Sequence, residues 1–268
     1  MGTTMICYPI ADKTTPIIVA GPQRSGTRFI TNVLNSVPGV TIHGEIPAPV
    51  INNIIKVIRK CDQKYLRENI ENSRKNWSIT KRDFMFAAWA NLNKGKRKKP
   101  DENCVFYGYK TPFHEKYFDF YNTFFDPIQP KYVCCVRGFI DHYLSVQARW
   151  PAVQARWPER NILFVAWKYV QSLRQLRYMK AQRPNDVLLF FLDDYKKIGF
   201  QYLRDRIFSP LGLYKLEAAQ RRAAKGAVNT AEQKGVQKKT QLTILQALYL
   251  KTNPQALQAY DLLRRDYG

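Results

Sequence analysis

The chain has 268 residues, of which 45% are hydrophobic, and its 43 Lys and Arg residues outnumber 21 Asp and Glu residues, giving a net charge of +22. This length can bury one large core, so we expect residues 1–268 to form a single domain with insertions. The charge excess favours anionic partners, namely nucleotides, sulfated or phosphorylated substrates, nucleic acids or acidic membranes, without choosing among them. No signal peptide or membrane-spanning stretch is recognisable, which predicts a soluble, cytoplasmic protein.

Short apolar runs alternate along the chain with longer amphipathic segments. Runs rich in β-branched or aromatic residues predict strands at 17–20, 105–109, 131–136 and 186–192. Amphipathic segments predict helices at 28–36, 47–60, 81–93, 141–147, 162–181, 240–251 and 254–265. This alternation predicts a P-loop-like, three-layer α/β/α fold with a central parallel sheet and a helical C-terminal region. Ligands of such sheets bind at the carboxyl ends of the strands.

Several other segments carry no motif that assigns a function. Residues 94–100 (KGKRKKP) form either a solvated surface loop or a docking patch for a polyanion. Residues 146–159 repeat seven residues, VQARWPA and then VQARWPE, which indicates a local duplication rather than a solenoid. Residues 221–239 predict a long, charged surface loop. We expect loops at 61–80 and 148–160 to shape a substrate pocket.

The cysteines give no sign of a metal site. They are odd in number, their spacing does not match that of metal ligands, and two of them are adjacent in a predicted buried strand. We expect reduced structural thiols at Cys7, Cys61, Cys104, Cys134 and Cys135.

A glycine-containing loop follows the first predicted strand. Residues 21–27 (GPQRSGT) have the two glycines of a nucleotide-binding P-loop, but Thr27 stands in place of its lysine and Arg28 in place of its Ser or Thr. Backbone N–H groups and the positive end of the following helix can still bind a phosphate. ATP or GTP hydrolysis, in contrast, loses the groups that hold the γ-phosphate and magnesium.

A second candidate anion site follows the strand at 131–136. Arg137 comes directly after this strand, and Ser145 lies eight residues further on a predicted helix. The arginine offers a rigid fork to phosphate oxygens, and a serine about two turns along the helix adds a hydroxyl on a similar face. Together these side chains suit one phosphate monoester.

These motifs together resemble the sulfotransferases that use 3′-phosphoadenosine 5′-phosphosulfate (PAPS). PQRSGTRF (22–29) is similar to their 5′-phosphosulfate loop, and VCCVRGFIDHYLS (133–145) is similar to their 3′-phosphate motif. A third similarity is LDDYKKIGFQYLRDRIFSPLGL (192–213), with an acidic residue before a long helix and an FLGL-type ending. The resemblance runs in order over residues 16–213.

The resemblance implies PAPS as the donor and 3′-phosphoadenosine 5′-phosphate (PAP) as the product, with no metal. Arg24 would contact the phosphosulfate and steady the leaving phosphate. Arg28 departs from the second Thr common in the family, which separates the chain from the steroid and phenol sulfotransferases. The residues implied in cofactor binding are Arg24, Ser25, Gly26, Thr27 and Arg28 in the loop, Arg137 and Ser145 at the 3′-phosphate, and Lys225 and Gly226 in a loop that closes over that phosphate.

The resemblance also bears on the catalytic base. Cytosolic members carry a Lys-Thr-His element, and its histidine is the base. The stretch GYKTPFH (108–114) resembles this element: it keeps Lys110 but has Pro112 at the histidine position. Lys110 ends a predicted strand, where its ammonium could stabilise the transition state.

Another branch, which includes protein-tyrosine sulfotransferases and many bacterial enzymes, uses the glutamate of a Gly-Glu pair. The chain resembles this branch at HGEIP (43–47), where Glu45 lies 21 residues after Arg24. Glu45 is therefore the expected base, and an ion pair or a helix first-turn charge is its structural alternative. His43 and His114 are the competing candidates, because either could titrate near neutral pH.

We therefore expect in-line transfer of a sulfuryl group from PAPS to a hydroxyl or amine of a glycan, small natural product or peptide. A P-loop nucleotide kinase is the alternative enzyme, disfavoured by Thr27. A polyanion-binding module is the non-enzymatic alternative, favoured by the net charge and by residues 94–100. We expect no membrane span and no specific nucleic-acid partner, and the sequence leaves the oligomeric state open.

Overall fold

A parallel β-sheet forms the centre of the computed structural model, which describes residues 14–67, 71–92, 103–149, 161–213 and 241–268. Within these ranges the strands are β1 (Thr15–Ala20), β2 (Val40–His43), β3 (Phe106–Lys110), β4 (Lys131–Val136) and β5 (Val187–Phe191). Their order in the sheet is β2-β3-β1-β4-β5, and every neighbouring pair is parallel. The predicted α/β class with a central parallel sheet is confirmed.

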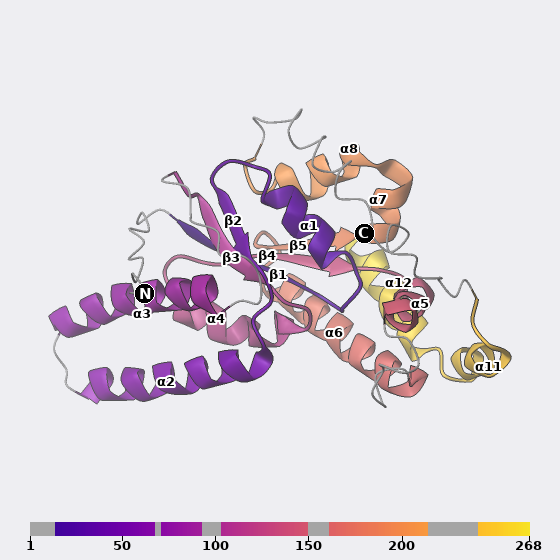
Figure 1. The fold of residues 1–268 in the computed structure, drawn as a ribbon, viewed down its shortest axis with the longest axis horizontal. Coiled ribbons are helices and arrows are strands. Elements are labelled where there is room, and N and C mark those ends of the chain that lie inside the picture. The colour runs from indigo at the N-terminus through magenta and orange to yellow at the C-terminus, as the bar shows by residue number, and fades with distance from the viewer. Residues whose placement is uncertain (1–13, 68–70, 93–102, 150–160, 214–240) are drawn as a thin grey trace, which may run out of the picture.

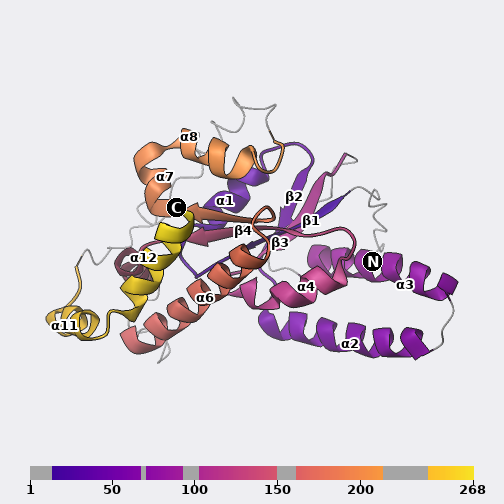
Figure 2. The same ribbon diagram turned by 180° about the vertical axis from the view of Figure 1, so that it is seen from behind.

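Helices cover both faces of this sheet. Figures 1 and 2 show α1 (Thr27–Leu34) and α7 (Leu192–Ile198) on one face, with α4 (Phe118–Phe124) and α6 (Ile162–Gln182) on the other. The strands are therefore buried on both sides, which explains why they read as continuous apolar runs rather than as alternating patterns. The remaining elements are α2 (Ala48–Arg67), α3 (Glu71–Asn91), η1 (His114–Tyr117), α5 (Phe139–Arg149), α8 (Phe200–Leu203), η2 (Arg204–Phe208), α11 (Ile244–Thr252) and α12 (Gln255–Tyr267).

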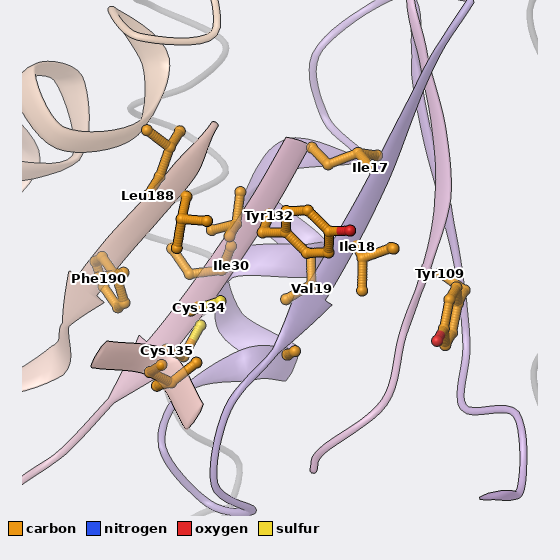
Figure 3. Packing of buried hydrophobic residues seen from close by; sticks show 14 of the residues in the cluster. Ile17, Ile18, Val19, Ile30, Tyr109, Tyr132, Cys134, Cys135, Leu188 and Phe190 are labelled. Atoms are coloured by element: carbon orange, nitrogen blue, oxygen red, sulfur yellow. The ribbon is translucent and has the colours of Figure 1, made fainter. Parts of the chain in front are cut away.

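The core surrounds β1, the middle strand. Its residues Ile17, Ile18 and Val19 are completely buried between β3 and β4, and Figure 3 shows these side chains beside those of β4 and α1. Cys134 and Cys135 in β4 are likewise buried free thiols, and burial raises the pKa of both. The four described cysteines are free thiols, of which all but Cys61 are buried, whereas the first cysteine of the chain lies outside the described residues.

The prediction of a loop at 61–80 was wrong. Helix α2 continues to Arg67, and α3 begins at Glu71, ten residues before the predicted start. The helical turns within residues 61–80 are rich in polar and charged residues, so they lack the apolar periodicity by which an amphipathic helix is recognised in a sequence. The strand β2 was missing from the runs that predicted strands, because it has four residues and includes Thr41 and His43.

Some predicted features lie outside the described residues. They are the basic run 94–100, the loop 221–239 and residues 150–159 of the tandem repeat. The helical C-terminal region is confirmed by α11 and α12. Among the described helices, none combines the length and apolarity needed to cross a membrane.

Gly21, the first residue after β1 in the glycine-containing loop, occupies a site that only glycine fits. Its φ angle is +114°, and a Cβ atom there would lie 2.2 Å from the carbonyl oxygen of Cys135. That atom belongs to the backbone of a central strand, so it cannot turn away as a flexible side chain would. The tight contact brings the start of the loop directly against β4.

We predict that Gly21→Ala destabilises the protein by at least about 3 kcal/mol, because it adds a backbone clash to a strained φ. Gly212→Ala is the matched control, since Gly212 has a φ of +70° but nothing within 4 Å of the added Cβ, and it should cost only about 1 kcal/mol. Urea unfolding of both variants measures the difference. Equal losses of stability would contradict the assigned backbone clash.

Candidate active site

The predicted site residues follow four strands that end at one edge of the sheet. The loop 21–26 follows β1, Glu45 lies two residues beyond β2, Lys110 ends β3, and Arg137 follows β4. Because these strands are parallel and adjacent, their carboxyl ends lie at the same edge. The topology therefore gathers residues that are far apart in the sequence.

The loop after β1 has the backbone shape of an anion-binding turn. Arg24 and Gly26 both have positive φ angles, of 63° and 105°. Gly26 is the N-cap of α1 and offers no side chain to the first amides of the helix, which leaves them available to a bound anion. Ser25 is fully buried and donates its hydroxyl to the carbonyl of Pro22, which stabilises the turn from within.

Thr27 and Arg28 occupy different surroundings at the start of α1. Thr27 is the first helical residue and is buried, with 5% of it exposed. Arg28 is exposed on the outside of the helix. Predicted contacts of the donor with these two residues would therefore be made from different sides of the loop.

Arg24 links the loop to the second anion motif. Its Nε donates a hydrogen bond to the hydroxyl of Ser145 on α5, over 3.2 Å. The two motifs, which are 121 residues apart in the sequence, thus meet through their own side chains. This contact places the loop beside the helix that follows Arg137.

Arg137 is held in place from several sides. Its Nη2 donates to Asp141, one turn along α5, over 2.8 Å, and its backbone carbonyl accepts a 2.6 Å bond from the hydroxyl of Tyr169. Asp141 also pairs with Lys196 at 3.1 Å. Burial alone would raise the pKa of Asp141, but the hydrogen bonds from Arg137 and Lys196 outweigh it and lower this pKa below its ordinary value.

The Arg137 guanidinium has a buried N–H that no group in the described part of the chain satisfies. The Nε of Arg137 is buried and has no hydrogen-bond partner among the described residues, although only 14% of the side chain is exposed. A buried N–H of a charged group is costly to leave unpaired. An anion placed between Arg137 and Ser145 would satisfy it.

His142 on α5 feels the charges of both arginines and was not identified from the sequence. The ring is 1% exposed and stacks near Tyr169, with ring centroids 4.9 Å apart. Burial, and then the positive charges of Arg137 and Arg24, lower the pKa of His142 to about 3, although a hydrogen bond with the Gln23 backbone opposes them. His142 therefore adds no positive charge beside the two arginines near neutral pH. Its position three residues before Ser145 on one helix was the only available sequence signal.

Lys110 and Glu45 form an ion pair at the adjoining part of the edge. The side chain of Lys110 is 10% exposed and that of Glu45 is 47% exposed, so the carboxylate lies on the outer side of the pair. Thr111 fixes the two loops to each other, because its hydroxyl accepts a 3.0 Å bond from the N–H of Ile46. The structure thus brings together the predicted cation and the predicted base.

His43 and His114, the competing bases, lie in the core. The two rings are 1% and 2% exposed, and each contacts a tyrosine hydroxyl: His43 contacts Tyr107 at 2.7 Å and His114 contacts Tyr109 at 2.9 Å. Burial, and then the charge of Lys116, lower the pKa of His114 to about 3. An imidazole this buried cannot reach an acceptor in this conformation. The geometry therefore separates both histidines from the role expected for Glu45.

Three further observations bear on the limits of the site. Lys225 and Gly226 lie outside the described residues. Within the described part of the chain, no cluster of three or more His, Cys, Asp or Glu side chains has the arrangement to hold a metal ion. A hollow of about 400 Å³ near Asp194 and Arg264 contains none of the predicted site residues.

Comparison with known families decides the class of the protein, because residues 16–201 match the profile described as the sulfotransferase family. The chain belongs to the sulfotransferase family. The matched region covers the loop after β1, Glu45, Lys110, Arg137 and Ser145. The enzyme class predicted from the motifs is confirmed.

Solved structures of other proteins resemble this sulfotransferase. The sulfotransferase domain of an olefin synthase from Synechococcus PCC 7002 is 13% identical with a TM-score of 0.47, and the alignment covers 92% of this chain and 97% of that one. Retinol dehydratase in complex with retinol and PAP is 16% identical with a TM-score of 0.46, covering 97% and 84%. A sulfotransferase from Mycobacterium avium is 11% identical with a TM-score of 0.47, covering 94% and 77%. No curated protein matches in sequence.

We predict that the buried His114 makes the stability of this sulfotransferase depend on pH. In the unfolded chain the ring takes up a proton below its ordinary pKa of 6.5, whereas the folded ring does so only near pH 3. Folding stability should therefore fall as pH decreases through this window, by up to about 1.4 kcal/mol per pH unit for this one group. His114→Phe should remove that part of the slope in urea unfolding between pH 6.5 and 4. Equal slopes for the variant and the wild type would show that His114 titrates normally.

Proposed function

We propose that this sulfotransferase takes its sulfuryl group from PAPS, releases PAP, and requires no metal for the transfer. The observation that supports this proposal is the 3.2 Å contact between Arg24 and Ser145. It joins the loop expected to hold the 5′-phosphosulfate to the helix expected to hold the 3′-phosphate. One nucleotide that carries both groups then engages both motifs, with the 3′-phosphate between Arg137 and Ser145.

Arg24 and Lys110 supply the positive charge for the transfer. As the acceptor oxygen bonds to sulfur, the bond from sulfur to the bridging oxygen breaks, and its electron pair stays on the 5′-phosphate of PAP. Cations fixed near that oxygen stabilise the developing charge. Lys110 suits this role because its nearly buried ammonium lies at the carboxyl edge beside the loop.

Glu45 is the base that takes the proton of the acceptor. The carboxylate is the more exposed partner of the ion pair with Lys110, so an acceptor can approach it. Pro112 cannot take a proton, which supports the Gly-Glu pair as the source of the base and the proposal that the chain belongs to the Gly-Glu branch of the family. A carboxylate is a weak base, so its effect depends on positioning as well as on basicity.

The acceptor is a hydroxyl or an amine of a glycan, a small natural product or a peptide, and residues 1–268 act as one catalytic domain.

The rival functions predict other behaviour. A nucleotide kinase would turn over ATP without binding PAP. A polyanion-binding module would bind any polyanion with a steep salt dependence and would not select PAP over other nucleotides.

We predict that the wild type binds PAP more tightly than AMP, because only PAP carries a 3′-phosphate. Arg137→Ala should weaken PAP binding by about 100-fold, since it removes charge-assisted bonds to that phosphate, and should leave AMP binding within about threefold of the wild type. Isothermal titration calorimetry with both nucleotides measures this. An equal loss of affinity for PAP and AMP would contradict the assigned 3′-phosphate site.

We predict that Glu45→Gln lowers kcat by at least about 100-fold while PAP binding is retained, because the amide cannot accept the acceptor proton. The measurement is an acceptor screen with labelled PAPS over glycans, peptides and small hydroxylated or amine compounds. Asp62→Asn, which removes a carboxylate from the surface of α2, is the matched control and should leave turnover unchanged. Full turnover by Glu45→Gln would mean that another group is the base.

A further inference from the structure

A buried carboxylate lies directly behind the phosphate loop. Glu115 in η1 is 2% exposed, and its Oε2 accepts a 3.1 Å hydrogen bond from the backbone N–H of Gly21, the first amide of the loop. Its other oxygen, Oε1, accepts the hydroxyl hydrogen of Ser172 on α6. The side chain therefore joins the loop to a helix on the other face of the sheet.

The segment from Lys110 to Glu115 lies alongside the end of β1 and the first residue of the loop. The N–H of Thr111 donates to the carbonyl of Val19 over 3.1 Å, and the N–H of Phe113 donates to the carbonyl of Gly21 over 3.0 Å. Phe113 has a φ of +62°, so the chain turns sharply just before Glu115. Both polar groups of the Gly21 backbone are thus bonded to the stretch that begins with Lys110.

The contacts leave Gly21 little freedom to move. On one side it abuts the backbone of Cys135, and on the other it is bonded to Phe113 and Glu115. The bond to Glu115 also means that the Gly21 amide is already used, so a bound anion depends on the later amides of the loop. Their position follows from where Gly21 is held.

Burying an acidic group here is costly, which indicates a specific role rather than core filling. Burial raises the pKa of Glu115, and the hydrogen bonds from Ser172 and Gly21 only partly oppose this. An apolar side chain would fill the same space but would leave the Gly21 amide buried without a partner. A glutamine would keep both contacts, since its carbonyl can accept from Gly21 and its amide can donate to the Ser172 hydroxyl.

We propose that Glu115 is a positioning residue of the donor site. It holds the first amide of the phosphate loop and thereby fixes the position of the loop relative to Lys110. The inference rests on the proposed donor site. It adds a residue that touches neither donor nor acceptor and acts only through Gly21.

The test compares Glu115→Ala with Glu115→Gln. Glu115→Ala should weaken PAP binding about tenfold, because the loop loses its anchor, and Glu115→Gln should stay within about twofold of the wild type. A second measurement needs no ligand: hydrogen exchange of the Gly21 amide should be about tenfold faster in Glu115→Ala than in the wild type. Leu173→Ala, a core truncation on α6, is the control for lost stability. When its unfolding temperature is as low as that of Glu115→Ala, it should still change neither PAP affinity nor the exchange rate of the Gly21 amide.

The outcomes separate this inference from the proposed function. Failure of the wild type to bind PAP would refute the donor assignment, while exchange of the Gly21 amide would still test Glu115. Unchanged exchange in Glu115→Ala, or equal effects of Glu115→Ala and Leu173→Ala, would overturn the positioning role. If Glu115→Ala does not fold, Ser172→Ala replaces it, with an expected threefold weakening of PAP binding, about half of the full effect in free energy; no change in binding and exchange would overturn the inference.

Discussion

The contact between Gly21 and the backbone of Cys135 is the constraint on which the site depends. It places the phosphate loop against β4, the strand that leads into Arg137. Because β1 lies between β3 and β4, the loop also borders the strand that ends in Lys110. A larger residue at position 21 would force the loop away from β4, and the distance between the two anion motifs would no longer fit one ligand. The central strand β1 therefore sets the distances between the loop, Arg137 and Lys110 at this edge of the sheet.

Acidic side chains and a neutral histidine limit the positive charge at this edge of the sheet. Asp141 pairs with Arg137, Glu45 pairs with Lys110, and burial lowers the pKa of His142 so that it adds no further charge. Without these groups, several positive charges would repel one another across a partly buried surface. The acidic partners hold Arg137 and Lys110 in defined positions before a ligand arrives, which reduces the ordering that binding requires.

The sequence was sufficient to predict the fold class and most of the residues at the edge, because those signals are local. Gly21 and Gly26 mark a turn between a strand and a helix, and Arg137 directly follows an apolar run. Glu115 and His142 were missed, since their roles arise from contacts with Gly21 and with Arg24 that are about 90 and 120 residues away in the chain. The polar helices around residues 61–80 were missed for another reason, namely that their pattern lacks apolar periodicity.

The order of the strands also affects how the protein is made. Both neighbours of β1 come from later parts of the chain, β3 from residue 106 and β4 from residue 131. While the polypeptide emerges from the ribosome, β1, which ends at Ala20, must wait until Phe106, 86 residues later, where β3, the earlier of its two neighbours, begins. During that interval a strongly apolar segment is exposed to solvent or to chaperones. The arrangement that gathers the catalytic edge at the middle of the sheet thus makes early synthesis the stage at which this chain is most prone to aggregate.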